Sequence, residues 1–162
     1  MAWYTPFDKA REFCERLPVP AFVNRPATRI RAVSLMYGFY LVMRGTAMRS
    51  QVFADRIAEK DTTFAMTLKD TGDRRYFTYS GGKVRTSLKG PEKPDFTLIW
   101  KDAPSGARVM TDMMFQKPKV LMKAVMAGDL LLDGDAALIG WFLETLNTML
   151  RALKNKPPKT AA

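Results

Sequence analysis

The chain is 162 residues long, which suits one domain with a single buried core. It contains no histidine and one cysteine, so histidine-dependent catalytic triads, histidine-ligated zinc and an internal disulfide are excluded. Twenty-six lysines and arginines against 16 aspartates and glutamates give a net charge of +10. This charge attracts phosphate in nucleic acid, in anionic lipid headgroups or in a small ligand.

The N-terminal part of the chain predicts helices. The first residues lack a basic segment followed by an apolar run, the pattern of a secretory signal, so we expect a cytoplasmic protein. Apolar residues at helical spacing predict a helix over residues 7–17, a second over residues 28–43, and a third that begins at a Thr46 cap. We assign residues 1–45 to a helical extension, residues 46–154 to one domain and residues 155–162 to a flexible tail.

The second of these helices contains the longest uncharged apolar stretch, residues 32–43. At 1.5 Å per residue, this stretch reaches about half to two-thirds of the way across a hydrocarbon core of ~30 Å, so it does not span a bilayer. Arginines precede and follow it, among them Arg31 and Arg44. Two interpretations stay open: a buried helix with solvated ends, and a helix that lies on an anionic membrane surface.

The middle of the chain predicts antiparallel strands, because apolar residues fall at every second position. Residues 62–68 alternate in this way, and residues 76–79 and 84–88 follow. The pair Gly81-Gly82 separates the last two segments, and glycine supplies the positive φ that a tight hairpin turn needs. Residues 96–100 alternate again, so we expect a meander of four strands with one apolar face.

The C-terminal part predicts three more helices and one more strand. Helical spacing predicts one helix over residues 103–115 and another from Pro118 to Gly128. The apolar run of residues 130–132 predicts a fifth strand that is buried on both faces. Asp135 is expected to cap the final helix.

No group of residues typical of catalysis, metal binding or phosphate binding stands out. The glycines fit neither a Walker loop nor a dinucleotide fingerprint. Asp133, Asp135 and Glu144 match positions 1, 3 and 12 of a calcium loop, but apolar residues stand where that loop needs another ligand and a glycine. Cys14 lies on a predicted apolar stripe, which is typical of a packed side chain and not of a nucleophile. We therefore expect no catalytic residue, no metal and no cofactor.

Methionines are frequent in the predicted strands and in the helices that follow them, and the chain has 11 in all. Because methionine is flexible and polarisable, a wall that contains it adapts to ligands of irregular shape. Methionine also fills gaps in ordinary cores. The sequence leaves both interpretations open.

Four segments, taken in order, resemble the sterol carrier protein type-two domain. They are the alternating residues 64–68, the hairpin around Gly81-Gly82, the segment Pro94-Asp95-Phe96-Thr97-Leu98-Ile99-Trp100, and residues 125–135 with their short strand and Gly-Asp turn. The resemblance, to a bacterial member with an added N-terminal helical extension, implies an α+β fold. In that fold, helices cover a five-stranded, mostly antiparallel sheet and leave an apolar lipid tunnel between the layers.

The resemblance also implies which residues line the tunnel. They are apolar positions on one face of the sheet and on the two helices that follow it: Phe64, Met66, Phe77, Phe96, Leu98, Trp100, Met110, Met113, Met114, Leu121, Met122, Val125 and Met126.

The function that the resemblance implies is intracellular lipid binding and transfer without enzymatic activity, for a fatty acid, fatty acyl-CoA or sterol-like ligand. An accessory role that presents a lipid intermediate of isoprenoid quinone biosynthesis is the alternative. Two hypotheses from other classes stay open. A nucleic-acid-binding protein is favoured by aromatic residues near basic ones, at Trp3, Tyr76 and Tyr79. An enzyme would have to use carboxylate, tyrosine or lysine chemistry. We expect a lipid or acyl-CoA partner, contact with an anionic membrane and no nucleic acid; a homo-oligomer stays open.

Overall fold

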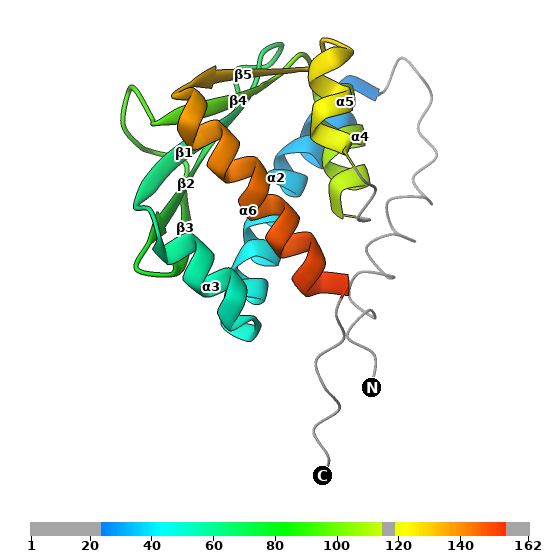
Figure 1. Cartoon of the computed structure of the whole chain (residues 1–162). Coiled ribbons are helices and arrows are strands. Elements are labelled where there is room, and N and C mark those ends of the chain that lie inside the picture. The colour runs from blue at the N-terminus through cyan, green and yellow to red at the C-terminus, as the bar shows by residue number, and fades with distance from the viewer. Residues whose placement is uncertain (1–23, 115–118, 155–162) are drawn as a thin grey trace.

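The computed structural model describes residues 24–114 and 119–154, and it places the helices on one side of a sheet (Figure 1). The predicted helix over residues 7–17, with Cys14, lies outside the described residues, as do Trp3, Pro118 and the tail of residues 155–162. In chain order the elements are α2 (Asn24–Arg49), α3 (Gln51–Ala58), β1 (Thr62–Leu68), β2 (Arg74–Ser80), β3 (Lys83–Ser87), β4 (Phe96–Trp100), α4 (Ala103–Met114), α5 (Val120–Met126), β5 (Leu130–Gly134) and α6 (Ala136–Lys154).

Helix α2 is continuous and crosses the predicted boundary at residue 45. The predicted Thr46 cap is wrong, because the Thr46 hydroxyl donates to the Val42 carbonyl oxygen at 2.7 Å, inside the helix. This bond satisfies a buried hydroxyl without interrupting the helix. The chain turns instead at Ser50, whose side chain accepts a hydrogen bond from the Phe53 amide at 3.3 Å and caps α3.

The sheet has five strands in the order β3-β2-β1-β4-β5 and is mostly antiparallel, as predicted. The predicted hairpin is confirmed, since Gly81 and Gly82 have φ values of 56° and 75°, both positive as the turn requires. The predicted meander holds only for the first three strands, because β4 lies parallel to β1 and not beside β3. Asp95 fixes this return, since its carboxylate accepts a hydrogen bond from the Thr63 amide at 2.8 Å.

Strand β5 lies at one edge of the sheet and pairs with β4. Leu130 is buried, but Leu131 is 61% exposed, so the prediction that this run is buried on both faces is wrong. The physical reason is the position of the strand. Leu131 pairs with Ile99 on the face of the sheet that points away from the helices, and the apolar run alone does not show whether a second layer covers that face.

The predicted cap of the last helix is confirmed. The Asp135 carboxylate accepts hydrogen bonds from the amides of Ala137 and Leu138, at 2.8 and 3.2 Å. Gly128, with a φ of 78°, follows the end of α5, as the sequence predicted. Of the helices that the structure describes, none is both long and apolar enough to cross a membrane.

Candidate functional site

The space between the sheet and the helices gathers most of the predicted lining residues. Side chains alternate along a strand, so every second residue of β1, β2 and β4 points to the helices. The six predicted lining residues on the sheet are all at most 1% exposed: Phe64, Met66, Phe77, Phe96, Leu98 and Trp100. The sheet half of the predicted site is therefore one continuous apolar surface.

The helix half of the predicted site divides into two groups. Met110 and Met113 of α4 and Leu121 of α5 are buried, and Met114 and Val125 pack partly buried against them. By contrast, Met122 and Met126 of α5 are 48% and 85% exposed and lie outside the buried cluster. That the buried members line a ligand cavity stays a prediction.

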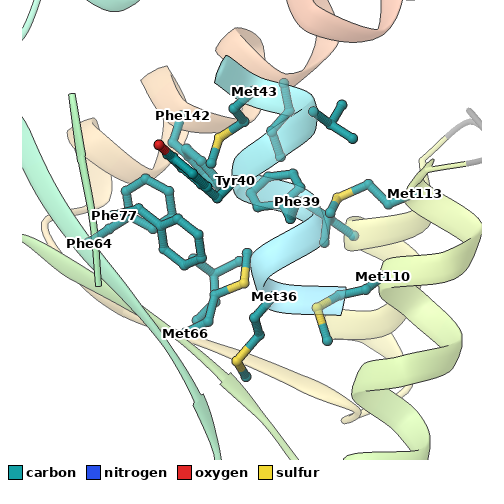
Figure 2. Packing of buried hydrophobic residues seen from close by; sticks show 14 of the residues in the cluster. Met36, Phe39, Tyr40, Met43, Phe64, Met66, Phe77, Met110, Met113 and Phe142 are labelled. Carbon is teal, nitrogen blue, oxygen red and sulfur yellow. The ribbon is translucent and has the colours of Figure 1, made fainter. Parts of the chain in front are cut away.

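Helix α2 supplies part of the site that sequence reasoning missed. Met36, Phe39 and Met43 are at most 1% exposed and point toward the sheet and α4, as Figure 2 shows. The close approach of α2 to α4 occurs at Gly38, where an added Cβ would lie 3.2 Å from the Met114 methyl carbon. Helix α2 also carries apolar residues on its outward side. The spacing of its apolar residues therefore does not show which side faces the core.

An aromatic stack marks the centre of this layer. The Phe64 ring lies parallel to that of Phe96, with centroids 4.9 Å apart, and stacks on that of Phe77 at 5.0 Å. The Phe142 ring of α6 covers both Phe64 and Phe96, at 4.8 and 5.0 Å. Aromatic pairs of this geometry add to the stabilisation that area burial supplies. Methionines surround this aromatic stack. The stacked rings are rigid, whereas the methionine side chains around them can adapt their shape.

Two polar atoms are buried at the edge of this apolar layer. The Tyr79 hydroxyl donates to the Met43 sulfur at 3.0 Å. Burial raises the pKa of Tyr79 far above its ordinary value, so the phenol stays neutral. The indole Nε1 of Trp100 is buried and has no hydrogen-bond partner among the residues that the structure describes.

Comparison with known proteins identifies the fold. Neither a protein-family model nor a curated protein sequence matches the chain. The structure of the UbiJ-SCP2 ubiquinone synthesis protein matches with a TM-score of 0.53 and 16% identity, over 70% of this chain and 93% of that chain. The sterol carrier protein domain 2 of Helicoverpa armigera gives a TM-score of 0.52 and 14% identity, over 72% of this chain and 89% of that chain. The chain has the sterol carrier protein type-two fold.

A larger protein is among the matches. The sec-alkylsulfatase Pisa1 from Pseudomonas sp. matches with a TM-score of 0.44 and 20% identity, over 65% of this chain and 15% of that chain. At these identities, likeness establishes the sterol carrier fold alone.

On the outside of this sterol carrier fold, a groove of about 350 Å³ runs between α4 and α5. Its floor contains Val109 and Ala124, which are buried members of the core cluster. Its rim carries Arg108, Lys123 and Asp129, and the Arg108 guanidinium lies 2.6 Å from the Asp129 carboxylate. At this groove, the adjoining sides of α4 and α5 lie between the buried core and solvent.

The two described tyrosines that left nucleic-acid binding open lie on opposite faces of the sterol carrier sheet. Tyr79 is buried under the helices. Tyr76 lies on the opposite face and is partly buried. An added Cβ at Gly90 would lie 2.5 Å from the Tyr76 ring, and the Arg74 guanidinium lies 5.1 Å from the ring centroid. Neither tyrosine offers an open ring on which a base could stack.

Proposed function

We propose that this protein is a non-enzymatic carrier that binds one lipid between the sheet and the helices. The observation that supports this most is the methionine-rich layer around the aromatic stack, built from Met36, Met43, Met66, Met110 and Met113. Methionine side chains change rotamer at low cost, so they can part around a hydrocarbon guest. Removing the guest from water contributes about 25 cal/mol per Å² of apolar surface, and no reacting group is needed.

The ligand classes are fatty acid, fatty acyl-CoA and sterol-like lipid. The test is a titration of delipidated protein with a fluorescent member of each class, and we expect saturation near one equivalent for at least one of them. Absence of saturable binding to all three contradicts lipid carriage.

A second candidate is an accessory role in isoprenoid quinone biosynthesis, in which the protein presents a lipid intermediate to membrane enzymes. It is supported by the likeness to the UbiJ-SCP2 ubiquinone synthesis protein, which extends over 93% of that chain. Mass spectrometry of lipid that copurifies with the protein separates the two candidates. A polyprenylated aromatic compound favours the accessory role, and fatty acids or acyl-CoA favour general carriage.

We propose that the groove between α4 and α5 is the mouth of the binding site. Val109 and Ala124 of its floor are in the same buried cluster as Met110 and Met113, so separation of the two helices there would open a path to the methionines. Helix α5 has seven residues and is bounded by Lys119 and Gly128, both with positive φ, so it is a short segment between two changes of backbone direction.

We propose that the outward face of α2 contacts an anionic membrane on the cytoplasmic side. Ile30, Tyr37, Leu41 and Met48 form one stripe along this face, each between 45 and 77% exposed, and Arg44 lies beside it. The net charge of +10 favours the same contact.

Sedimentation with vesicles tests this contact. We expect binding to phosphatidylglycerol vesicles, weak binding to phosphatidylcholine vesicles, and loss of binding in Leu41→Glu. Leu131→Glu is the matched control, because Leu131 is also exposed but lies on the far face of the sheet. Equal binding by the two variants contradicts the proposed surface.

A further inference from the structure

The indole of Trp100 is a buried hydrogen-bond donor that the fold leaves without an acceptor. Trp100 is 0% exposed, and no described residue accepts from its Nε1. An unsatisfied buried donor costs about 1–3 kcal/mol, and the large majority of buried side-chain polar atoms avoid this cost. A phenylalanine would fill much of the same space without the cost, so the donor itself needs an explanation.

The neighbours of Trp100 in the sheet are apolar. Trp100 lies in register with Leu68 of β1 and Leu130 of β5, and both neighbours are buried. Helix α4 covers it at Gly106, where an added Cβ would lie 3.2 Å from the Trp100 ring. The side chains that flank it in the sheet carry no charge and no acceptor.

Other buried aromatic donors in the described part of the chain are satisfied. The Trp141 indole donates to the Glu59 carboxylate at 3.1 Å, and the Tyr79 hydroxyl donates to the Met43 sulfur at 3.0 Å. The remaining unsatisfied buried atoms belong to side chains that are only partly buried and can reach solvent: Arg31, Thr67, Arg74 and Arg75. Trp100 therefore differs from the other residues of the core.

We propose that Trp100 donates this hydrogen bond to an oxygen atom of the bound lipid. The inference rests on the proposed function and narrows its ligand class. The acceptor is a neutral oxygen, such as a quinone carbonyl, a sterol hydroxyl or an acyl thioester carbonyl, because a carboxylate would lose its hydration in this apolar place. The oxygen-bearing end of the ligand thus enters the core and does not stay at the surface.

Nuclear magnetic resonance of the full chain tests the contact directly. The indole N–H signals of the three tryptophans are assigned with Trp100→Phe and Trp141→Phe. A benzoquinone with a decyl chain is then compared with decylbenzene, which has the same tail and no oxygen. We expect a downfield shift of the Trp100 indole proton with the quinone and not with decylbenzene. Cholesterol and oleoyl-CoA, titrated in the same way, distinguish a hydroxyl from a thioester carbonyl as the acceptor.

The affinities give the second measurement. We expect Trp100→Phe to weaken quinone binding about tenfold, the effect of one lost hydrogen bond, and to change decylbenzene binding less than twofold. Trp141→Phe, whose indole has an acceptor within the protein, should leave the ratio of the two affinities unchanged. Equal weakening of both probes by Trp100→Phe, or an indole proton that stays unshifted in the complexes with the quinone, cholesterol and oleoyl-CoA, overturns the inference while lipid carriage stands. If neither probe nor any other lipid binds the wild type, lipid carriage fails and the inference fails with it.

Discussion

Helices α4 and α5 carry the same residue type in the same predicted role, yet the structure places their methionines differently. Met110 and Met113 of α4 are buried against the sheet, whereas Met122 and Met126 of α5 point outward. The difference follows from the length and composition of the helices. Helix α4 has 12 residues, and its buried positions fall on one side. Helix α5 has seven residues, and apolar side chains surround it, so its sequence does not specify which side faces the core.

This comparison shows that a methionine count does not locate a binding wall. Burial depends on which side of a short helix the neighbouring elements cover, and Leu121 and Ala124 fix that side for α5. If α4 and α5 differ in solution as they do in the structure, matched substitutions on the two helices should have unequal effects.

The largest effect is expected for a buried charge on α4. Met113→Glu places a carboxylate among apolar side chains, so we expect the free energy of unfolding to fall by about 3–5 kcal/mol, with loss of lipid binding. Met122→Glu, on the exposed side of α5, should change the free energy of unfolding by less than about 0.5 kcal/mol. Urea unfolding measures both, and Met113→Leu controls for the change of shape. Similar losses in the two glutamate variants would show that Met122 is also buried.

A cavity under α5 should have the next largest effect. Leu121→Ala removes the side chain that anchors this helix in the core, and we expect a loss of about 2 kcal/mol. Met126→Ala is the matched truncation on the exposed side, where little contact is lost. The same unfolding experiment compares them, and a larger loss in Met126→Ala is the result that would reverse the assignment of the two sides.

Filling the groove between the helices should slow ligand uptake. Ala127 is exposed and lines the groove, so Ala127→Trp blocks it without a change in the core. We expect the rate of fluorescent fatty-acid uptake in stopped flow to fall roughly tenfold, which corresponds to about 1.4 kcal/mol in the barrier. Ala137→Trp, on the exposed first turn of α6, is the control. Unchanged uptake in Ala127→Trp places the mouth elsewhere.

The smallest effect is expected for the ion pair between Arg108 of α4 and Asp129, which follows α5. The Arg108 side chain is exposed, so its pairing with Asp129 contributes little against water, and Arg108→Ala should cost at most about 1 kcal/mol. The cost should shrink further in high salt. A loss that exceeds that of Leu121→Ala would mean that this pair, and not apolar burial, holds α5 in place.

The strands were predictable because a strand with one buried face has an apolar residue at every second position. Every second residue of β1 and β4 is apolar, and Gly81-Gly82 supplies the one backbone conformation that the hairpin needs. The resemblance to the sterol carrier family implied the six sheet residues of the candidate site, and the alternation in β1 and β4 agrees with them. The parallel return of β4 beside β1 was not predictable, since local patterns do not state which strands pair over long separations.

Three other features were less predictable, each for a physical reason. Thr46 has the chemistry of a cap but bonds within its own helix, and sequence does not distinguish these uses of a hydroxyl. Leu131 belongs to an apolar run but lies on an edge strand, where no second layer covers it. The inward residues of α2 were missed because that helix is apolar on two sides, and only the tertiary structure separates the buried side from the exposed one.

The position of Phe142 has a consequence for biosynthesis. Its ring closes the aromatic stack over Phe64 and Phe96, yet it comes from α6, which a ribosome makes after every strand of the sheet. Until synthesis passes α6, a nascent chain therefore holds a finished sheet in which Phe64 and Phe96 lack the cover of Phe142. During that interval its phenylalanines are open to chaperones or to aggregation, so truncations within α6 should accumulate in insoluble form.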